Sequence, residues 1–172
     1  MTILVLMGVT GCGKTTIGAA LAARFGWEFL EGDSLHPPAN IAKMAAGTPL
    51  DDVDRLPWLR AIAARIDAWP TQDISSVVAC SALKRAYRKI LIGSRTDIRL
   101  VYLRGDRDTI AGRLRARRGH FMPPSLLDSQ FRALEEPGTD EAPITVPLNG
   151  TPETIVTMIV EALRCTPRST LA

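Results

Sequence analysis

The sequence is poor in the residues and runs that mark several protein classes. Among its 172 residues are three cysteines, Cys12, Cys80 and Cys165, which are odd in number, far apart and without a CxxC pair. This usage argues against a disulfide framework and fits a reducing cytoplasm. The apolar run near the N-terminus, residues 3–7, is too short to span a membrane and follows no basic segment of a secretory signal. We expect a soluble cytoplasmic protein without a membrane partner.

The chain also lacks an excess of charge of one sign. Its 21 basic and 18 acidic residues give a net charge of +3, which is too small to argue for a nucleic acid partner. The arginine-rich stretch at 113–118 has no interleaved aromatic residues and follows Asp106 and Asp108. Hydrophobic residues make up 46% of a chain of ordinary domain length. We expect a single domain over residues 1–172 that does not bind nucleic acid.

Short apolar runs alternate with segments of helical period along the chain. The runs are continuously apolar, which indicates strands buried on both faces of a parallel sheet. Between them, apolar residues recur every four positions and form stripes that face the sheet. The pattern predicts an α/β fold with three layers. The expected strands are residues 3–7, 27–30, 77–80, 98–103 and 144–146, and the stripes are Ile17/Leu21/Phe25, Ile62/Ile66, Ile110/Leu114 and Ile155/Ile159.

Two segments interrupt this alternation, and we expect both to fold over a bound ligand. Residues 34–60 hold four prolines and an acidic cluster at Asp51, Asp52 and Asp54. The second interruption begins in the arginine-rich stretch and predicts a lid over residues 117–130. Because core elements flank each segment, they are excursions from the sheet rather than interdomain linkers.

Residues 8–15 match the phosphate-binding pattern GxxxxGK[ST] at every fixed position. The motif follows an expected strand and opens an expected helix, a context that distinguishes a P-loop from a glycine-rich turn without a ligand. Its glycines let backbone N–H groups surround a phosphate, and the helix N-terminus adds a positive field. The pattern predicts that Lys14 reaches the β- and γ-phosphates of a nucleotide and that Thr15 binds Mg²⁺. The residues expected to bind ATP here are Gly8, Val9, Thr10, Gly11, Cys12, Gly13, Lys14, Thr15 and Thr16.

Cys12 lies at a position that the P-loop pattern leaves open. Its simplest interpretation is a small residue that is tolerated there. The alternative is that the helix N-terminus favours its thiolate, so that oxidation or alkylation would block ATP binding.

The carboxyl end of the second expected strand carries Glu31, Gly32 and Asp33. Ligands of parallel sheets bind beyond the carboxyl ends of the strands, so Asp33 should project toward the γ-phosphate. A carboxylate there can orient and deprotonate an attacking hydroxyl, or hold Mg²⁺ through water. A helix N-cap or a turn aspartate before Ser34 is the alternative role for Asp33. Since the third strand ends in Cys80-Ser81 without an acidic residue, Glu31 and Asp33 are the nearest carboxylates for the metal.

Several segments, taken in chain order, closely resemble the gluconokinases. GDSLHP at 32–37 and CSALK at 80–84 point to gluconate, whereas the P-loop alone indicates only a nucleotide. Glu31 departs mildly from the family, in which Asp is familiar at that position. The likeness extends to about Glu141 and covers residues 8–15, 31–44, 47–59, 80–88, 113–121, 130–131 and 134–138.

The resemblance implies a fold like that of nucleoside monophosphate and shikimate kinases, with a five-stranded parallel sheet. It implies ATP-dependent phosphorylation of the gluconate 6-hydroxyl, Mg²⁺ as cofactor and a homodimer. By position, Asp33 matches the acceptor-facing aspartate of the family, and His36 and Gln130 are candidates for substrate binding. A structural turn residue is the alternative interpretation of His36.

Two pairs of basic residues are candidates for anion binding. Lys84 and Arg88 are four residues apart, so they are predicted to share a helix face and bind the acceptor carboxylate; a solvated basic face is the alternative. Arg113 and Arg117 resemble the lid arginines of monophosphate kinases, in which the first packs on adenine and the second reaches the phosphates. We expect Lys14, Asp33 and Arg117 to be catalytic, with charge stabilisation outweighing base catalysis.

Two alternative functions make different demands on the same sequence. A kinase for shikimate or another sugar acid would share the P-loop and lid and differ in residues 33–60 and 81–88. A nucleotide-dependent switch that uses GTP would need the patterns NKxD and DxxG, and the sequence contains neither.

Overall fold

The computed structural model describes residues 1–116 and 124–165 of the chain. Within this part, five parallel strands form one sheet in the order β2-β3-β1-β4-β5. Each expected strand is confirmed, with ends that differ from the prediction by at most one residue. The strands are β1 (Ile3–Met7), β2 (Glu28–Glu31), β3 (Ser76–Ala79), β4 (Ile98–Arg104) and β5 (Ile144–Pro147).

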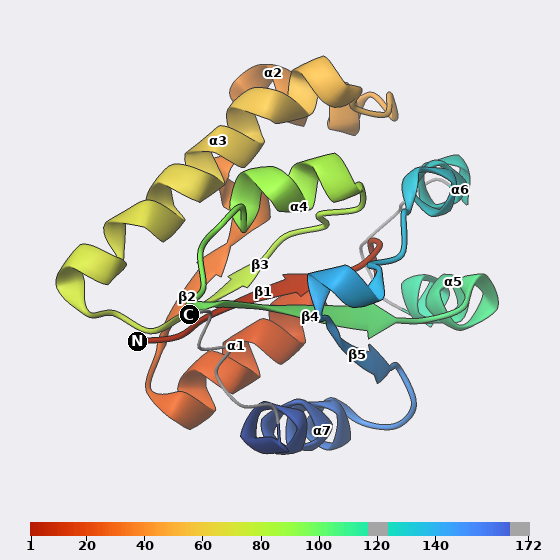
Figure 1. The fold of residues 1–172 in the computed structure, drawn as a ribbon. Helices are drawn as coiled ribbons and strands as arrows, with labels where there is room; N and C mark the ends of the chain where they lie inside the picture. The colour runs from red at the N-terminus through yellow and green to blue at the C-terminus, as the bar shows by residue number, and fades with distance from the viewer. Residues whose placement is uncertain (117–123, 166–172) are drawn as a thin grey trace.

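Helices cover both faces of the sheet and confirm the three-layer architecture (Figure 1). Helices α1 (Lys14–Phe25) and α7 (Pro152–Cys165) cover one face, and α3 (Asp52–Ala68) and α4 (Arg85–Leu91) cover the other. Successive residues of β1 contribute to opposite cores, because side chains alternate across a strand. Each fully buried aliphatic side chain contributes about 1.5–3 kcal/mol, so these two cores fix the sheet on which the site is built.

The segment predicted only as an excursion over residues 34–60 is largely helical. It contains the end of a short 3₁₀ helix, η1 (Gly32–Leu35), then α2 (Pro38–Ala45) and the first turns of α3. Asp51 caps α3: its carboxylate accepts from the Asp54 N–H at 2.8 Å, and the Asp54 carboxylate accepts from the Asp51 N–H at 3.1 Å. This capping box starts α3 at the acidic cluster and thereby directs the cluster toward the carboxyl edge of the sheet.

Two further helices, α5 (Arg107–Ala116) and α6 (Pro124–Ala133), lie beyond the carboxyl ends of the strands (Figure 1). Of the expected lid, residues 117–123 lie outside the described residues, and these include Arg117. Residues 124–130 belong to α6. The short helices η2 (Pro70–Gln72) and η3 (Thr139–Glu141) complete the described part.

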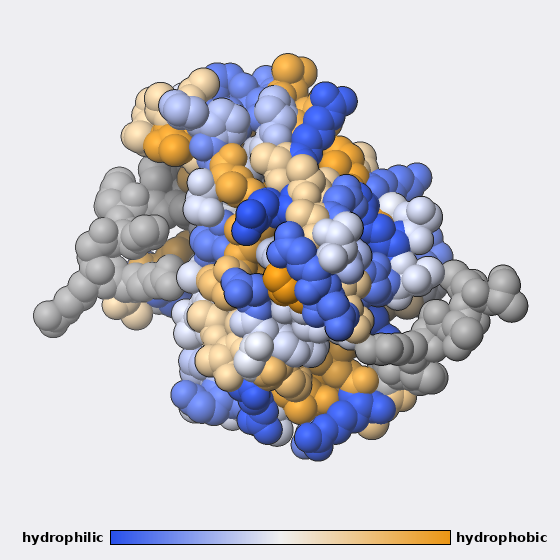
Figure 2. Space-filling view, turned by 90° about the vertical axis from the view of Figure 1, so that its left-hand side faces the viewer, coloured by the Kyte–Doolittle hydropathy of each residue, from blue (hydrophilic) through white to orange (hydrophobic). Residues whose placement is uncertain are grey.

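The opposite edge of the molecule, toward the amino ends of the strands, faces the viewer in Figure 2. Hydrophilic and hydrophobic residues are mixed over this edge. None of the described helices is long and apolar enough to cross a bilayer.

Candidate active site

The P-loop connects β1 to α1 and leaves the first turn of α1 open to a ligand. Gly13 is the N-cap residue of α1 in a left-handed conformation with φ of 95°, and no side chain caps the helix. Gly8 has φ of 146°, and a Cβ there would lie 2.9 Å from the Leu103 carbonyl oxygen. Only glycine therefore fits the loop at these two positions. The first N–H groups of α1 are the donors that bind phosphate in such loops.

Lys14 is folded back onto the loop. Its Nζ donates to the carbonyl oxygens of Gly8 at 2.9 Å and Val9 at 3.1 Å. Cys12 is fully buried, with its Sγ 3.9 Å from Lys14 Nζ, and its environment is that of a packed side chain. Phosphate oxygens could replace the two carbonyl oxygens around the ammonium group, so the lysine lies where the motif requires it.

Thr15 and Glu31 form an oxygen pair beside the loop. The Thr15 hydroxyl donates to Glu31 Oε2 at 2.5 Å. Hydroxyl and carboxylate oxygens are the ligands that Mg²⁺ prefers, and it commonly takes one or two from the protein and the rest from phosphates and water. The described residues contain no group of three or more His, Cys, Asp or Glu side chains that could hold a metal.

Asp33 is exposed next to this pair, with 67% of its side chain accessible. The alternative that Asp33 is an N-cap is wrong, because Glu31 caps η1 and accepts from the Asp33 N–H at 3.4 Å. Asp33 lies in the first turn of η1, just beyond the carboxyl end of β2, and its Oδ1 is 3.9 Å from His36 Nε2.

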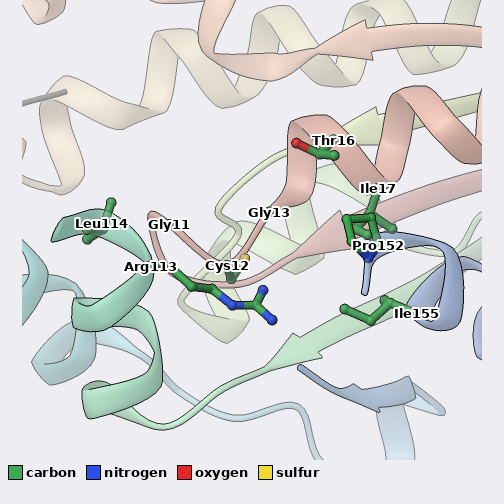
Figure 3. A pocket seen from close by; sticks show the side chains of 9 residues that line it. All are labelled: Gly11, Cys12, Gly13, Thr16, Ile17, Arg113, Leu114, Pro152 and Ile155. Atoms are coloured by element: carbon green, nitrogen blue, oxygen red, sulfur yellow. The ribbon is translucent and has the colours of Figure 1, made fainter. Parts of the chain in front are cut away.

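A cavity of about 180 Å³ lies beside the P-loop, and Arg113 lines it (Figure 3). The guanidinium group extends from α5 toward Pro152 and Ile155 and donates to the Leu148 carbonyl oxygen at 2.9 Å. A planar guanidinium group opposite apolar walls is a surface on which an aromatic base can stack. The lining residues are Gly11, Cys12, Gly13, Thr16, Ile17, Arg113, Leu114, Pro152 and Ile155.

A second cavity of about 460 Å³, larger than the first, lies between the starts of α3 and α4 and the helix α6, and its lining combines apolar with charged side chains. Asp52 accepts from Lys84 Nζ at 2.7 and 2.9 Å and also from the Tyr87 hydroxyl. These bonds, the one from Lys84 foremost, lower the pKa of Asp52, and burial followed by the bond to Asp52 raises the pKa of Tyr87. The cavity is lined by Pro49, Leu50, Asp51, Asp52, Val53, Arg55, Leu83, Lys84, Tyr87, Ser129, Gln130 and Ala133.

Arg55 is a cation of this cavity that the sequence analysis missed. Its Nε donates to the Leu50 carbonyl oxygen at 3.3 Å, and its guanidinium carbon lies 5.9 Å from the centre of the Tyr87 ring. Within the described part of the chain, no carboxylate lies within ion-pair distance of Arg55, whereas Lys84 is paired with Asp52. The sequence signal for Arg55 is its position one helical turn after the N-cap residue Asp51. This position places Arg55 at the same edge of the sheet as the acidic cluster.

Lys84 and Arg88, predicted to share a helix face and bind the acceptor carboxylate, lie in different environments, and a solvated basic face is excluded for Arg88. Arg88 is 2% exposed, and Lys84 precedes α4 as its N-cap residue. The Arg88 guanidinium group donates to both carboxylate oxygens of Glu141, at 2.5 and 2.8 Å, and to three backbone carbonyl oxygens. The structure therefore uses Arg88 inside the protein, because its donors are already satisfied there.

His36 is buried, and its ring stacks on Trp58 with centroids 4.2 Å apart. Its Nε2 lies 3.9 Å from Asp33 Oδ1. Burial lowers the pKa of His36, outweighing the opposite influence of the Asp33 charge. The backbone of His36 also ends η1, so the turn role and a side-chain role beside Asp33 coexist.

Gln130 links α6 to the P-loop. Its Oε1 accepts a hydrogen bond of 2.7 Å from the Thr10 N–H, and its side chain also lines the larger cavity. The residue predicted for substrate binding thus touches the phosphate loop and the second cavity together.

Comparison with known proteins places this geometry in a family. A family model described as shikimate kinase matches residues 10–164. A gluconokinase of Gluconobacter oxydans is 46% identical over 161 residues, which cover 91% of this chain and 88% of that protein. The chain belongs to the gluconokinase family. The thermoresistant gluconokinase of Escherichia coli is 43% identical over 94% of this chain and 93% of its own length.

Solved structures agree with this membership of the gluconokinase family. The crystal structure of a gluconokinase from Sinorhizobium meliloti superposes with a TM-score of 0.87 at 41% identity, covering 95% of this chain and 91% of that one. The predicted P-loop kinase fold and the resemblance to gluconokinases are thereby confirmed, and the chain is an enzyme of the kinase class.

Proposed function

We propose that this chain transfers the γ-phosphoryl group of ATP to the 6-hydroxyl of D-gluconate, giving 6-phospho-D-gluconate and ADP. The observation that carries the proposal is an open P-loop beside a cavity lined by Arg55, a cation without an ion-pair partner among the described residues, in a member of the gluconokinase family. An acceptor that carries a carboxylate needs such a cation, and a neutral sugar does not.

In this proposal the nucleotide occupies the P-loop and the smaller cavity. The base stacks on Arg113, and the phosphates lie on the backbone N–H groups from Gly8 to Thr16. Lys14 exchanges its two carbonyl partners for phosphate oxygens. This places the γ-phosphate at the carboxyl edge of the sheet, toward Asp33.

The acceptor occupies the larger cavity. Arg55 binds the carboxylate of the acceptor through its two terminal nitrogens, because its contact with the Leu50 carbonyl oxygen uses only Nε. Lys84 contributes as half of an ion pair with Asp52, and its field on the ligand is therefore weaker than that of Arg55. His36 and Gln130 bind hydroxyl groups. Arg88 is left out of this binding set, because its donors are already bonded within the protein.

The chemical step needs little covalent help from the protein. The acceptor oxygen forms a bond to the γ-phosphorus while the bond from that phosphorus to the β–γ bridging oxygen breaks. The hydroxyl proton passes to Asp33, and ADP leaves with the electron pair. Lys14 neutralises charge on the phosphoryl group, which matters more than base catalysis in phosphoryl transfer. Arg117, outside the described residues, is proposed to add to this neutralisation.

Mg²⁺ is proposed to bind through Thr15, with Glu31 beside it and Asp33 as a partner through water. When bound, the ion would lower the negative charge of the phosphates that the acceptor meets. We further propose that residues 1–172 act as one kinase domain, with a substrate-binding segment at 34–60 and a lid at 117–130. A cytoplasmic homodimer is also proposed.

An acceptor panel tests this function. ADP release is followed by a coupled assay with ATP and gluconate, other aldonates, shikimate and neutral glucose. We expect kcat/KM for gluconate to exceed that for every other acceptor by at least about tenfold, because the site must bind both a carboxylate and a row of hydroxyl groups. A higher value for shikimate would favour the alternative kinase, and ADP release that no acceptor stimulates would contradict acceptor phosphorylation altogether.

A further inference from the structure

Asn40, in the first turn of α2, is buried between His36 and α3, with 4% of its surface exposed. Its Nδ2 lies 2.8 Å from the Asp54 carbonyl oxygen and 3.3 Å from His36 Nδ1. A carbonyl oxygen can only accept, so the amide atom that faces it must be the NH₂ group. The same NH₂ group is therefore the donor to His36.

This contact decides where the His36 ring carries its proton. A ring nitrogen that accepts a hydrogen bond is unprotonated, so the neutral ring holds its proton on Nε2. The ring orientation is fixed from the other side, because His36 stacks on Trp58, which itself donates to the Gly32 carbonyl oxygen at 2.7 Å. Asn40 and Trp58 together hold the Nε2–H in one direction.

The Nε2–H points to the side of the carboxylate of Asp33. Its distance of 3.9 Å from Asp33 Oδ1 is too long for a hydrogen bond but leaves room for one oxygen atom bonded to both. Among the described residues, Nε2 has no hydrogen-bond partner. The two groups thus form a pair, one donor and one acceptor, that is open to a third polar atom.

We propose that Asn40 is a positioning residue that fixes the Nε2–H tautomer of His36, so that His36 and Asp33 together bind the acceptor hydroxyl. The inference rests on the proposed function, in which Asp33 faces that hydroxyl. A hydroxyl is donor and acceptor at once: its oxygen accepts from Nε2–H while its proton is directed to Asp33. The other tautomer would place a lone pair beside the carboxylate, and two acceptors cannot both satisfy the hydroxyl oxygen.

The tautomer can be observed directly by nuclear magnetic resonance of the full chain labelled with ¹⁵N-histidine. The chain has two histidines, His36 and His120, so a His120→Gln variant assigns both rings. At neutral pH we expect the two-bond ¹H–¹⁵N pattern of a ring protonated at Nε2 for His36. A ring protonated at Nδ1, or a mixture of the two forms, in the wild-type protein would overturn the inference whether or not gluconate is phosphorylated.

Variants of α2 separate positioning from mere stability. Asn40→Asp offers a carboxylate to Nδ1 and should move the proton there, and Asn40→Ala should give a mixture. Lys43→Met is the matched control, because Lys43 also ties α2 to Asp54, at 2.7 Å, without touching the ring. We expect Lys43→Met to keep the wild-type pattern. A shift of the tautomer in Lys43→Met equal to that in Asn40→Ala would overturn the role of Asn40.

A second pair of variants tests the donor itself and does not depend on Asn40 variants folding. His36→Gln can place an N–H near the Nε2 position, whereas the shorter His36→Asn cannot, and both lose the stacking on Trp58. We expect the KM for gluconate to rise about tenfold more in His36→Asn than in His36→Gln, the value of about one hydrogen bond, with an unchanged KM for ATP. Equal KM values for gluconate in the two variants would contradict the donor role.

Discussion

The side chain of Gln130 accepts a hydrogen bond of 2.7 Å from the backbone N–H of Thr10, which joins helix α6 to the P-loop. The two residues are 120 positions apart in the sequence. Because Gln130 also lines the larger cavity, the acceptor side and the phosphate side of the site share one side chain. The position of the loop therefore depends on α6, whose first seven residues, 124–130, form the end of the proposed lid.

Replacing Gln130 tests this link. Gln130→Met removes the acceptor for the Thr10 N–H at similar size and should raise the KM for ATP about fivefold, the effect of one lost hydrogen bond. Gln130→Glu keeps an acceptor but adds a negative charge beside the phosphates, so it should raise the KM for ATP further, and less so at high salt. Steady-state kinetics at two salt concentrations measure both effects. Arg132→Gln, an exposed change on the same helix, is the control, and equal KM values in all three variants would rule out the link.

The acceptor cation is predicted to be Arg55. Arg55→Met should raise the KM for gluconate about 10- to 100-fold, because a charge-assisted hydrogen bond contributes about 1.5–3 kcal/mol, and should leave the KM for ATP within about twofold. Arg55→Lys should recover part of the loss by restoring the charge without the paired geometry. If Arg55→Met changed the KM for ATP and for gluconate equally, Arg55 would be a structural residue and the acceptor would bind elsewhere.

A separate prediction concerns the loss of kcat in variants of Lys14, Arg117 and Asp33. Charge neutralisation of the transferring phosphoryl group is worth on the order of 10³–10⁵ in rate, and a general base about 10²–10⁴. Lys14→Ala or Arg117→Ala should therefore lower kcat at least as much as Asp33→Asn. Single-turnover measurements on variants with matched thermal stability provide the comparison. A larger loss in Asp33→Asn than in both cation variants would reverse the ranking.

Arg88 should act on stability rather than on substrate binding. Glu141→Gln breaks a buried ion pair and should lower the free energy of unfolding by about 3 kcal/mol at neutral pH, with an unchanged KM for gluconate. The bond from Arg88 lowers the pKa of Glu141 in the folded protein. The stabilisation is therefore complete above the ordinary carboxyl pKa of about 4.3 and is lost as the pH falls through the lowered folded pKa.

Urea unfolding at several pH values measures this dependence. The difference between wild type and Glu141→Gln should shrink as the solution is acidified below about pH 4.3. A constant difference across that range would mean that the Glu141 charge does not contribute. A raised KM for gluconate in Glu141→Gln would indicate that Arg88 belongs to the acceptor site.

Local patterns were sufficient to predict the sheet, the P-loop and Asp33. Strands β1, β3 and β4 were predicted because they are largely apolar runs, and the structure buries them on both faces. The expectation of burial on both faces is wrong for the edge strands: β2 has no fully buried residue, and β5 alternates buried with exposed residues. Helix α2 was not predicted, because Pro37 and Pro38 stand at its start, although the first turn of a helix tolerates proline. The capping box of Asp51 and Asp54 was the available signal for the start of α3.

The cations could not be assigned from the sequence because their partners are distant along the chain. Arg88 meets Glu141, 53 residues away, and Lys84 meets Asp52, 32 residues away. Spacing alone indicated a shared face for Lys84 and Arg88, whereas the tertiary packing buries Arg88 and leaves Arg55 as the cation open to an acceptor. Which cation is neutralised within the fold is a property of the packing and not of local sequence.

The position of the phosphate on the product tests the central proposal most directly. After complete conversion of gluconate with ATP, ³¹P and ¹³C nuclear magnetic resonance of the isolated product locates the ester. We predict one phosphate monoester, coupled to the two protons of carbon 6, in a one-to-one ratio with ADP. An ester at any other carbon, or ADP formed with inorganic phosphate and unmodified gluconate, would contradict it.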